Sequence, residues 1–201
     1  NDNKKKVTDS ASSGTALATG KKTYNGAISV NHDKQPIKTI IEWAIEKEMS
    51  TGLIATSSIT HATPASFATH VNSRRLENEI AHQMAISNIN VLFGGGKKYW
   101  SDNAIEKFVS NNGFFIENID TPLPKNKNIL GLFNYDALPT ANKRIITSTK
   151  MTKIALDILD KNNNGFFLMV EESQIDWGGH SNDGITIKNE LFDRYRTNED
   201  F

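Results

Sequence analysis

Ser10 is the first residue of this chain whose type and setting could do chemistry. It lies within residues 7–15, where an acid, Asp9, precedes it and small residues follow it. Small neighbours leave a serine hydroxyl accessible, and the N-terminus of a helix offers free backbone N–H groups to an anion. An ordinary helix cap has the same composition, so the segment alone supports either a nucleophile or a cap.

Residues 60–74 carry a second group of reactive side chains. His61 and Thr63 offer nitrogen and oxygen ligands, and Arg74 has a planar guanidinium that can hold two phosphate oxygens at once. A solvated surface arginine is the alternative for Arg74, because Arg75 is next to it and charged residues follow. The residue types alone do not separate these two interpretations.

Residues 166–180 carry the third group. A short apolar run ends at Glu171, and Asp176 and His180 follow it. One carboxylate and one imidazole at this short spacing suit zinc, although such pairs are common in proteins. The chain has no cysteine, so any zinc would be held by histidine and carboxylate ligands.

These three segments resemble motifs of the alkaline phosphatase family, and they follow one another in the family's order. Residues 7–15 match its nucleophile motif, and residues 60–74 and 166–180 match its metal and phosphate motifs. The resemblance runs over residues 7–183 and implies a bacterial-type alkaline phosphatase. It implies hydrolysis of phosphate monoesters to phosphate and an alcohol through a phosphoserine on Ser10.

The resemblance also implies roles for the side chains around the substrate. Arg74 would bind the phosphate together with Ser10 as catalytic residues, and Asp9 would orient Arg74. Trp177 would lie near the substrate, at a position where other relatives carry a basic residue. A coordinated zinc would lower the pKa of the Ser10 hydroxyl and so activate it.

Two Zn²⁺ ions and one Mg²⁺ ion are the cofactors that the resemblance implies. The implied metal ligands are Ser10, His61, Thr63, Glu171, Asp176 and His180. Asp176 and His180 would supply two of the three protein ligands of one zinc, and Ser10 would bind the other zinc. Glu171 and Thr63 would hold Mg²⁺.

His61 leaves two alternatives open for the identity of the third metal. Some relatives carry an aspartate at this position, and imidazole suits Mg²⁺ less well than a carboxylate does. The third site could therefore hold a third Zn²⁺, or Mg²⁺ bound through water. Other ligands of the family are absent: a Gly-Asp-Gly motif before residues 7–15, and an Asp-His pair and a further His after His180. We therefore expect a central fragment of an alkaline phosphatase that is inactive, or nearly so, by itself.

Apolar periodicity indicates the elements that position these residues. We expect helices at residues 10–19, 36–49, 64–87 and 149–160, strands at 53–57, 90–93 and 166–170, and surface loops at 111–143. Alternating strands and helices predict an α/β fold with a mostly parallel central sheet and helices on both faces, alkaline-phosphatase-like and incomplete at both ends. Residues 1–201 would form one partial domain with a divergent tail at 184–201. Sites in such sheets lie beyond the carboxyl ends of the strands.

Composition limits the partners. The 23 basic and 23 acidic residues balance, which gives no indication of nucleic-acid-specific binding. No run approaches the roughly 20 apolar residues of a membrane span, and residues 1–6 lack the apolar stretch of a signal peptide. Small phosphate monoesters are the expected partners, and the resemblance alone implies a periplasmic or secreted location and a homodimer.

Other functions remain open from the sequence. The same fold could act on a phosphodiester or a sulfate ester, or the chain could be a non-catalytic remnant that binds metal or phosphate. A glycine run at residues 94–96 precedes Lys97 and Lys98 and invites comparison with a phosphate-binding loop. It lacks the spacing of that loop, so we expect a turn that ends a strand.

Overall fold

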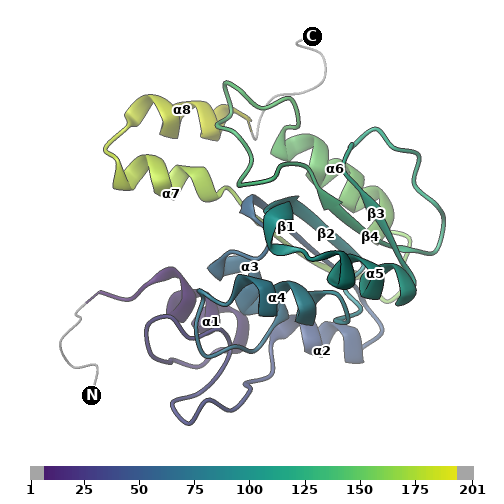
Figure 1. Cartoon of the computed structure of the whole chain (residues 1–201), viewed down its shortest axis with the longest axis horizontal. Helices are drawn as coiled ribbons and strands as arrows, with labels where there is room; N and C mark the ends of the chain where they lie inside the picture. Colours follow the sequence, from purple (N-terminus) through teal and green to yellow (C-terminus); the bar gives the residue numbers. More distant parts are fainter. Residues whose placement is uncertain (1–6, 194–201) are drawn as a thin grey trace.

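The computed structural model describes residues 7–193, which are built around one parallel sheet of five strands (Figure 1). The strands lie in the order β3-β4-β2-β1-β5, and every neighbouring pair is parallel. Their bounds are β1 Ser50–Ser58, β2 Val91–Gly95, β3 Gly113–Ile116, β4 Asn128–Leu132 and β5 Phe166–Glu171. Parallel strands need crossover connections, and helices provide most of them.

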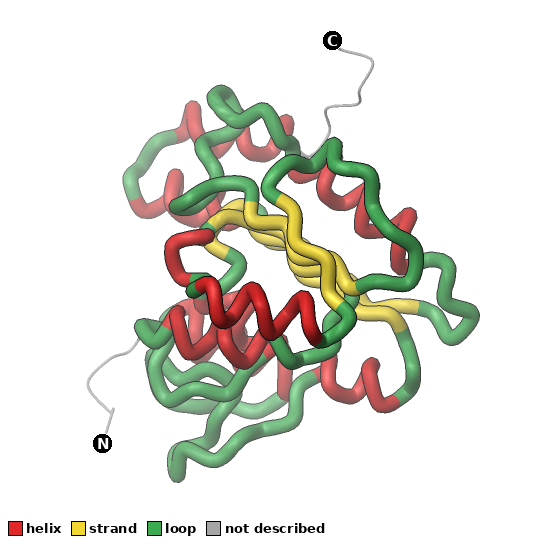
Figure 2. The backbone as a smooth tube through the Cα atoms, turned by 45° about the vertical axis from the view of Figure 1, so that its right-hand side comes forward, coloured by secondary structure: helices red, strands yellow, loops and turns green. Residues whose placement is uncertain are grey.

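Helices cover both faces of this sheet (Figure 2). Their bounds are α1 Ser10–Thr19, α2 Ile40–Glu46, α3 Ala62–Ala68, α4 Glu77–Met84, the 3₁₀ turn η1 Lys97–Tyr99, α5 Asp102–Ser110, α6 Ser148–Leu159, α7 Ser173–His180 and α8 Gly184–Asp193. None of the described helices has both the length and the apolar character that a membrane span needs. The predicted α/β class with a parallel, helix-covered sheet is confirmed.

Strand β1 shows how the sheet separates two apolar cores. Leu53 and Ala55 pack among residues of α1 to α5, whereas Ile54, between them in sequence, packs with Phe93 among residues of α6. All four side chains are fully buried. Successive side chains of a strand point to opposite faces, so a nearly continuous apolar run is what a central parallel strand requires.

The expectation of loops throughout residues 111–143 was wrong, because this stretch contains β3 and β4. Strand β4 is an inner strand between β2 and β3, and all of its residues are buried. Its apolar core is only Ile129, Leu130 and Leu132, and asparagine, lysine and proline surround it in the sequence. Burial on both faces stabilises a run too short to stand out, because Ile129 packs in the core that includes α6, and Leu130 and Leu132 pack in the core that includes α4 and α5.

The expected helices at 36–49 and 64–87 differ from the observed ones, because the first is shorter and the second is interrupted. The first begins only after Thr39, whose side chain and that of Glu42 form a reciprocal capping box. The second is split into α3 and α4, because Val71 leaves the helix and pairs with Ile28 in an isolated antiparallel bridge. The resulting loop, residues 69–76, carries Arg74.

A core truncation should show how strongly this sheet depends on packing. Phe93→Ala removes a fully buried ring between β2 and α6, and we expect it to lower the free energy of unfolding by about 3–5 kcal/mol. Ile145→Ala is the matched control, since Ile145 is 95% exposed. Urea unfolding followed by circular dichroism measures both, and equal effects of the two substitutions would contradict this description of the core.

Candidate functional site

Ser10 is the first residue of α1, directly after the residue that caps the helix. Asp9 has extended backbone geometry, and its carboxylate accepts the backbone N–H of Ser12 at 3.0 Å. Ser10 is half-buried, and its hydroxyl has no hydrogen-bond partner among the residues that the structure describes. The cap of this helix is therefore Asp9 rather than Ser10, and the Ser10 hydroxyl stays unengaged beside it.

The small residues of α1 have a packing function as well. Helix α1 lies against α3 so closely that a Cβ atom at Gly14 would come within 3.0 Å of the Ser66 Oγ atom and 3.5 Å of the Thr63 Cα atom. The Ser66 hydroxyl also donates to the backbone carbonyl of Ala11 at 3.3 Å. This contact places Thr63, in the first turn of α3, next to α1, whose first residue is Ser10.

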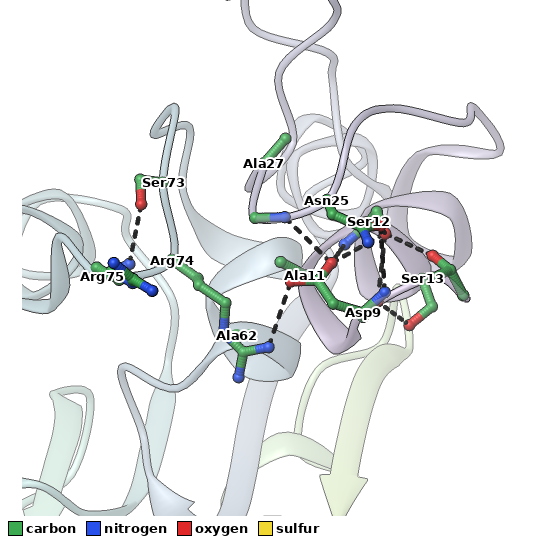
Figure 3. Close-up of polar contacts among 12 residues, drawn as sticks. Asp9, Ala11, Ser12, Ser13, Asn25, Ala27, Ala62, Ser73, Arg74 and Arg75 are labelled. Carbon is green, nitrogen blue, oxygen red and sulfur yellow. Dashed lines mark hydrogen bonds and ion pairs between the residues drawn. The ribbon is translucent and has the colours of Figure 1, made fainter. Parts of the chain in front are cut away.

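Arg74 extends from the loop after α3 toward the start of α1 (Figure 3). One guanidinium nitrogen lies 3.5 Å from the Asp9 carboxylate, and the other lies 3.0 Å from His61 Nε2. The neighbouring Arg75 is exposed and forms a hydrogen bond through its backbone to Ser73. Arg74 is thus held beside Asp9 and His61, while Arg75 is the solvated arginine.

Several groups act on the charge of Asp9. Partial burial would raise the pKa of its carboxyl, but the hydrogen bonds from the backbone of Ser12 and Gly26, the Ser12 hydroxyl and the Arg74 charge together lower that pKa. Asp9 therefore remains an anion near neutral pH. The ion pair between Asp9 and Arg74 is partly exposed to solvent, so it orients the Arg74 side chain but adds little to the stability of the fold.

His61 follows β1 and packs edge-on against Trp177 of α7, with 5.9 Å between the ring centroids. Burial and then the Arg74 charge lower the pKa of His61, while the carboxylates of Glu171, Glu77 and Asp176 act in the opposite direction. The imidazole is therefore neutral at physiological pH. Its Nδ1 atom is buried without a hydrogen-bond partner in the described chain.

Glu171 reaches the same edge from the neighbouring strand. It is the last residue of β5 and is in register with Ala55 of β1, and its carboxylate accepts the Ser173 hydroxyl at 2.6 Å. The Ser173 hydroxyl oxygen in turn accepts the Ser57 backbone N–H at 3.2 Å and lies 2.9 Å from the Ser57 hydroxyl. These contacts join the carboxyl ends of β1 and β5, which is where the sequence led us to expect a site.

Asp176 and His180 lie one helical turn apart on α7. Their side chains are 64% and 80% exposed, and Asp176 Oδ2 is 3.5 Å from His180 Nε2. Residues four apart on a helix share one face, so both can present ligand atoms to one ion. Trp177, between them in sequence, brings this helix to His61.

The donor atoms fit metal binding in part. Oxygen and imidazole donors suit Zn²⁺ and Mg²⁺, and the unpartnered Nδ1 of His61 is a buried lone pair or proton that lacks a protein partner. Among residues 7–193, however, no three histidine, aspartate or glutamate side chains converge closely enough to hold an ion. The predicted ligands therefore form pairs and single donors rather than a closed site.

Two other segments near the site remain to be described: the glycine run at residues 94–96, which the sequence analysis considered, and residues 24–28, which it did not. Gly96 has φ +88° and links β2 to η1, while Lys97 and Lys98 form ion pairs with Glu117 and Asp136. The predicted turn at the end of the strand is therefore confined to Gly96, because Gly94 and Gly95 still belong to β2. Sequence reasoning missed residues 24–28, although Asn-Gly at positions 25 and 26 is a turn signal.

Glu77 was also missed. It is the first residue of α4, and its carboxylate accepts the hydroxyls of Ser58 at 2.9 Å and Thr60 at 2.7 Å. It thereby fixes the short loop that carries the chain from β1 to His61. A glutamate in a polar stretch gives no sequence signal for such a role, because its partners lie at the end of a distant strand.

The fold and this edge define an α/β protein with a serine at a helix N-terminus and an arginine held beside it. A family model described as alkaline phosphatase matches residues 1–194. Alkaline phosphatase 3 of Bacillus subtilis is 42% identical, over 96% of this chain and 44% of that protein. The chain therefore belongs to the alkaline phosphatase family, and it spans less than half the length of that relative.

Solved structures agree with this assignment. The cold-active alkaline phosphatase of a psychrophilic Shewanella species superposes with a TM-score of 0.90 at 42% identity, over 94% of this chain and 48% of that one. A variant of the alkaline phosphatase from the Antarctic bacterium TAB5, in which a histidine is replaced by aspartate, superposes with a TM-score of 0.85 at 37% identity. The match covers 96% of this chain and 58% of that one. That variant holds Mg in its M3 site.

The lowered pKa of Asp9 predicts a pH-dependent contribution to stability. A carboxyl whose pKa is lower in the folded state than in the unfolded state stabilises the fold, and this contribution is complete above the unfolded-state pKa of about 3.9. The contribution is lost as the pH falls through the pKa of the folded state. We expect Asp9→Asn, which keeps a capping side chain, to be less stable than the natural chain at pH 6 by no more than about 1 kcal/mol. The difference should shrink toward pH 2.5 in urea unfolding, and a constant difference would contradict the assignment.

Proposed function

We propose that this protein hydrolyses phosphate monoesters, with Ser10 as the nucleophile and Arg74 as the phosphate-binding residue. The observation that carries the proposal is the placement of Arg74, which lies between Asp9 and His61 beside the first turn of α1. A dianionic phosphoryl group at this point would meet a guanidinium fork and the free N–H groups of a helix N-terminus. The family assignment and the unengaged Ser10 hydroxyl agree with that role.

The reaction that follows from this arrangement has two displacements at phosphorus. In the first, Ser10 Oγ forms a bond to phosphorus while the ester P–O bond breaks, and the proton lost by Ser10 is balanced by the one that the departing oxygen takes up from solvent to leave as the alcohol. In the second, a water oxygen forms a bond to phosphorus while the Ser10 Oγ–P bond breaks, Ser10 Oγ regains a proton, and inorganic phosphate is released. Arg74 would hold two non-reacting phosphate oxygens throughout, and Asp9 would keep the guanidinium in place.

Metal ions are part of the proposal. Asp176 and His180 would hold one Zn²⁺, Ser10 would contact a second, and Glu171, Thr63 and His61 would supply donors for a third ion, Mg²⁺ or Zn²⁺. When bound, such ions lower the pKa of a coordinated hydroxyl and stabilise anionic oxygens. The described residues offer at most part of each ligand set, so we expect the 201-residue chain by itself to be inactive or nearly so.

Location and assembly belong to the same proposal. The resemblance to bacterial alkaline phosphatases supports work outside the cytoplasm, in the periplasm or beyond the cell, and supports pairing with a second copy. Neither property affects how Ser10 and Arg74 meet the phosphate.

A chimera tests the proposed nucleophile. This chain would replace the matching segment of Bacillus subtilis alkaline phosphatase 3, which is 42% identical to it, so that the relative supplies the remaining ligands. With Zn²⁺ and Mg²⁺ present, we expect the chimera to hydrolyse p-nitrophenyl phosphate. Ser10→Ala should lower kcat by at least about a hundredfold, because covalent catalysis is lost.

Ser13→Ala is the matched control for that experiment. The Ser13 hydroxyl lies one helical turn away and donates to the Asp9 backbone carbonyl at 2.8 Å, so its loss should change kcat little. The separate 201-residue chain should show no turnover above background under the same conditions. Binding of phosphate without turnover in a folded, zinc-loaded chimera would favour a non-catalytic protein, and full activity of Ser10→Ala would exclude the proposed nucleophile.

A further inference from the structure

Residues 24–28 form a connection between the two parts of the proposed site. On one side they contact the start of α1, and on the other they contact the loop that carries Arg74. Tyr24 donates its hydroxyl to the Asn72 carbonyl at 3.1 Å, and Ile28 exchanges two backbone hydrogen bonds of 3.0 Å with Val71. The segment is thereby fixed to the Arg74 loop at both of its ends.

The Asn25 side chain lies against the residues on both sides of Ser10 in the sequence (Figure 3). Its amide oxygen accepts the Asp9 backbone N–H at 3.3 Å and lies 3.0 Å from the Ser12 hydroxyl, which is also 3.0 Å from the Asp9 carboxylate. Its amide nitrogen donates to the Val7 carbonyl at 3.1 Å. Two hydrogen bonds and one further polar contact of a single side chain therefore connect the chain before Ser10 to the helical turn after it.

The backbone of Gly26 makes the matching connection to Arg74. Its N–H donates to the Asp9 carboxylate at 3.1 Å, and its carbonyl accepts the Arg74 backbone N–H at 2.7 Å. Gly26 has φ +88°, a backbone conformation that favours glycine. A single residue, Gly26, therefore links Asp9, which precedes Ser10, to the backbone of Arg74, the residue proposed to bind phosphate.

We propose that Asn25 is a positioning residue for Ser10, and that the Asn25–Gly26 turn sets the placement of Ser10 relative to Arg74. This inference rests on the proposed function of those two residues. The chain before α1 needs such a support, because Val7 is 79% exposed and no core packing holds it. Without the Asn25 amide, the Asp9 and Val7 backbone would exchange their hydrogen bonds for water, and the first turn of α1 would lose its fixed direction toward Arg74.

Inorganic phosphate is the probe, because its binding to the 201-residue chain requires no turnover. We would titrate isotope-labelled chain with phosphate and follow the amide signals of Ser10 to Ser12 and the side-chain Nε–H signal of Arg74 by NMR. Asn25→Ala should weaken phosphate binding about tenfold. Its phosphate-dependent shifts should decrease more at the Ser10 to Ser12 amides than at the Arg74 side chain, a difference that a general loss of stability would not produce.

Asn31→Ala is the matched control. Asn31 lies on the same connection between α1 and α2, and its side chain accepts the backbone N–H groups of Asp33 and Gln35 within its own turn. This variant should bind phosphate like the natural chain. Equal losses in Asn25→Ala and Asn31→Ala, or unchanged binding in Asn25→Ala, would overturn the inference.

Two further variants keep the result interpretable. Arg74→Gln tests the proposed function itself. If this variant binds phosphate as well as the natural chain does, Arg74 is not the phosphate-binding residue, and the proposed function fails whatever the effect of Asn25→Ala. Ser12→Ala removes one partner of Asn25 and covers the case in which Asn25→Ala does not fold. It should weaken phosphate binding less than the loss of Asn25, about threefold, and unchanged binding in Ser12→Ala would contradict the proposal.

Discussion

The Asp9 carboxylate is the interaction on which the candidate site depends. It caps α1 through Ser12, accepts the backbone N–H of Gly26 and lies beside the Arg74 guanidinium. These partners come from three separate segments, so one carboxylate fixes the start of a helix, a turn and a distant loop together. Because its pKa is lowered by these contacts, Asp9 keeps the charge that holds Arg74 in place.

The parallel sheet supplies the second constraint, which is adjacency. Strands β1 and β5 are neighbours although more than a hundred residues separate them, and both end at the same edge. His61 follows β1, and Glu171 ends β5. Helix α7, which follows β5, places Trp177 against His61. Residues from separate motifs therefore meet because carboxyl ends of parallel strands meet, as in other open α/β sheets.

The sequence predicts the residues of this site better than their supports. Ser10, Arg74 and Glu171 stand in recognisable local patterns, whereas β4 is short and apolar only at its centre, so burial by its neighbours decides its conformation. The split between α3 and α4 depends on the pairing of Val71 with Ile28, a contact that no local pattern encodes. Asn25 was missed for the same physical reason, since its role comes from partners that only the folded chain brings together.

The most direct test is a crystal structure of this chain soaked with tungstate, an anomalously scattering analogue of phosphate. The account predicts tungsten beside the first turn of α1, with tungstate oxygens within hydrogen-bond distance of the Arg74 guanidinium and of Ser10. Arg75→Gln crystals should keep that peak, and Arg74→Gln crystals should lose it. A tungsten peak only elsewhere, for example at Lys97 and Lys98 after β2, would contradict the claim that Ser10 and Arg74 form the phosphate site.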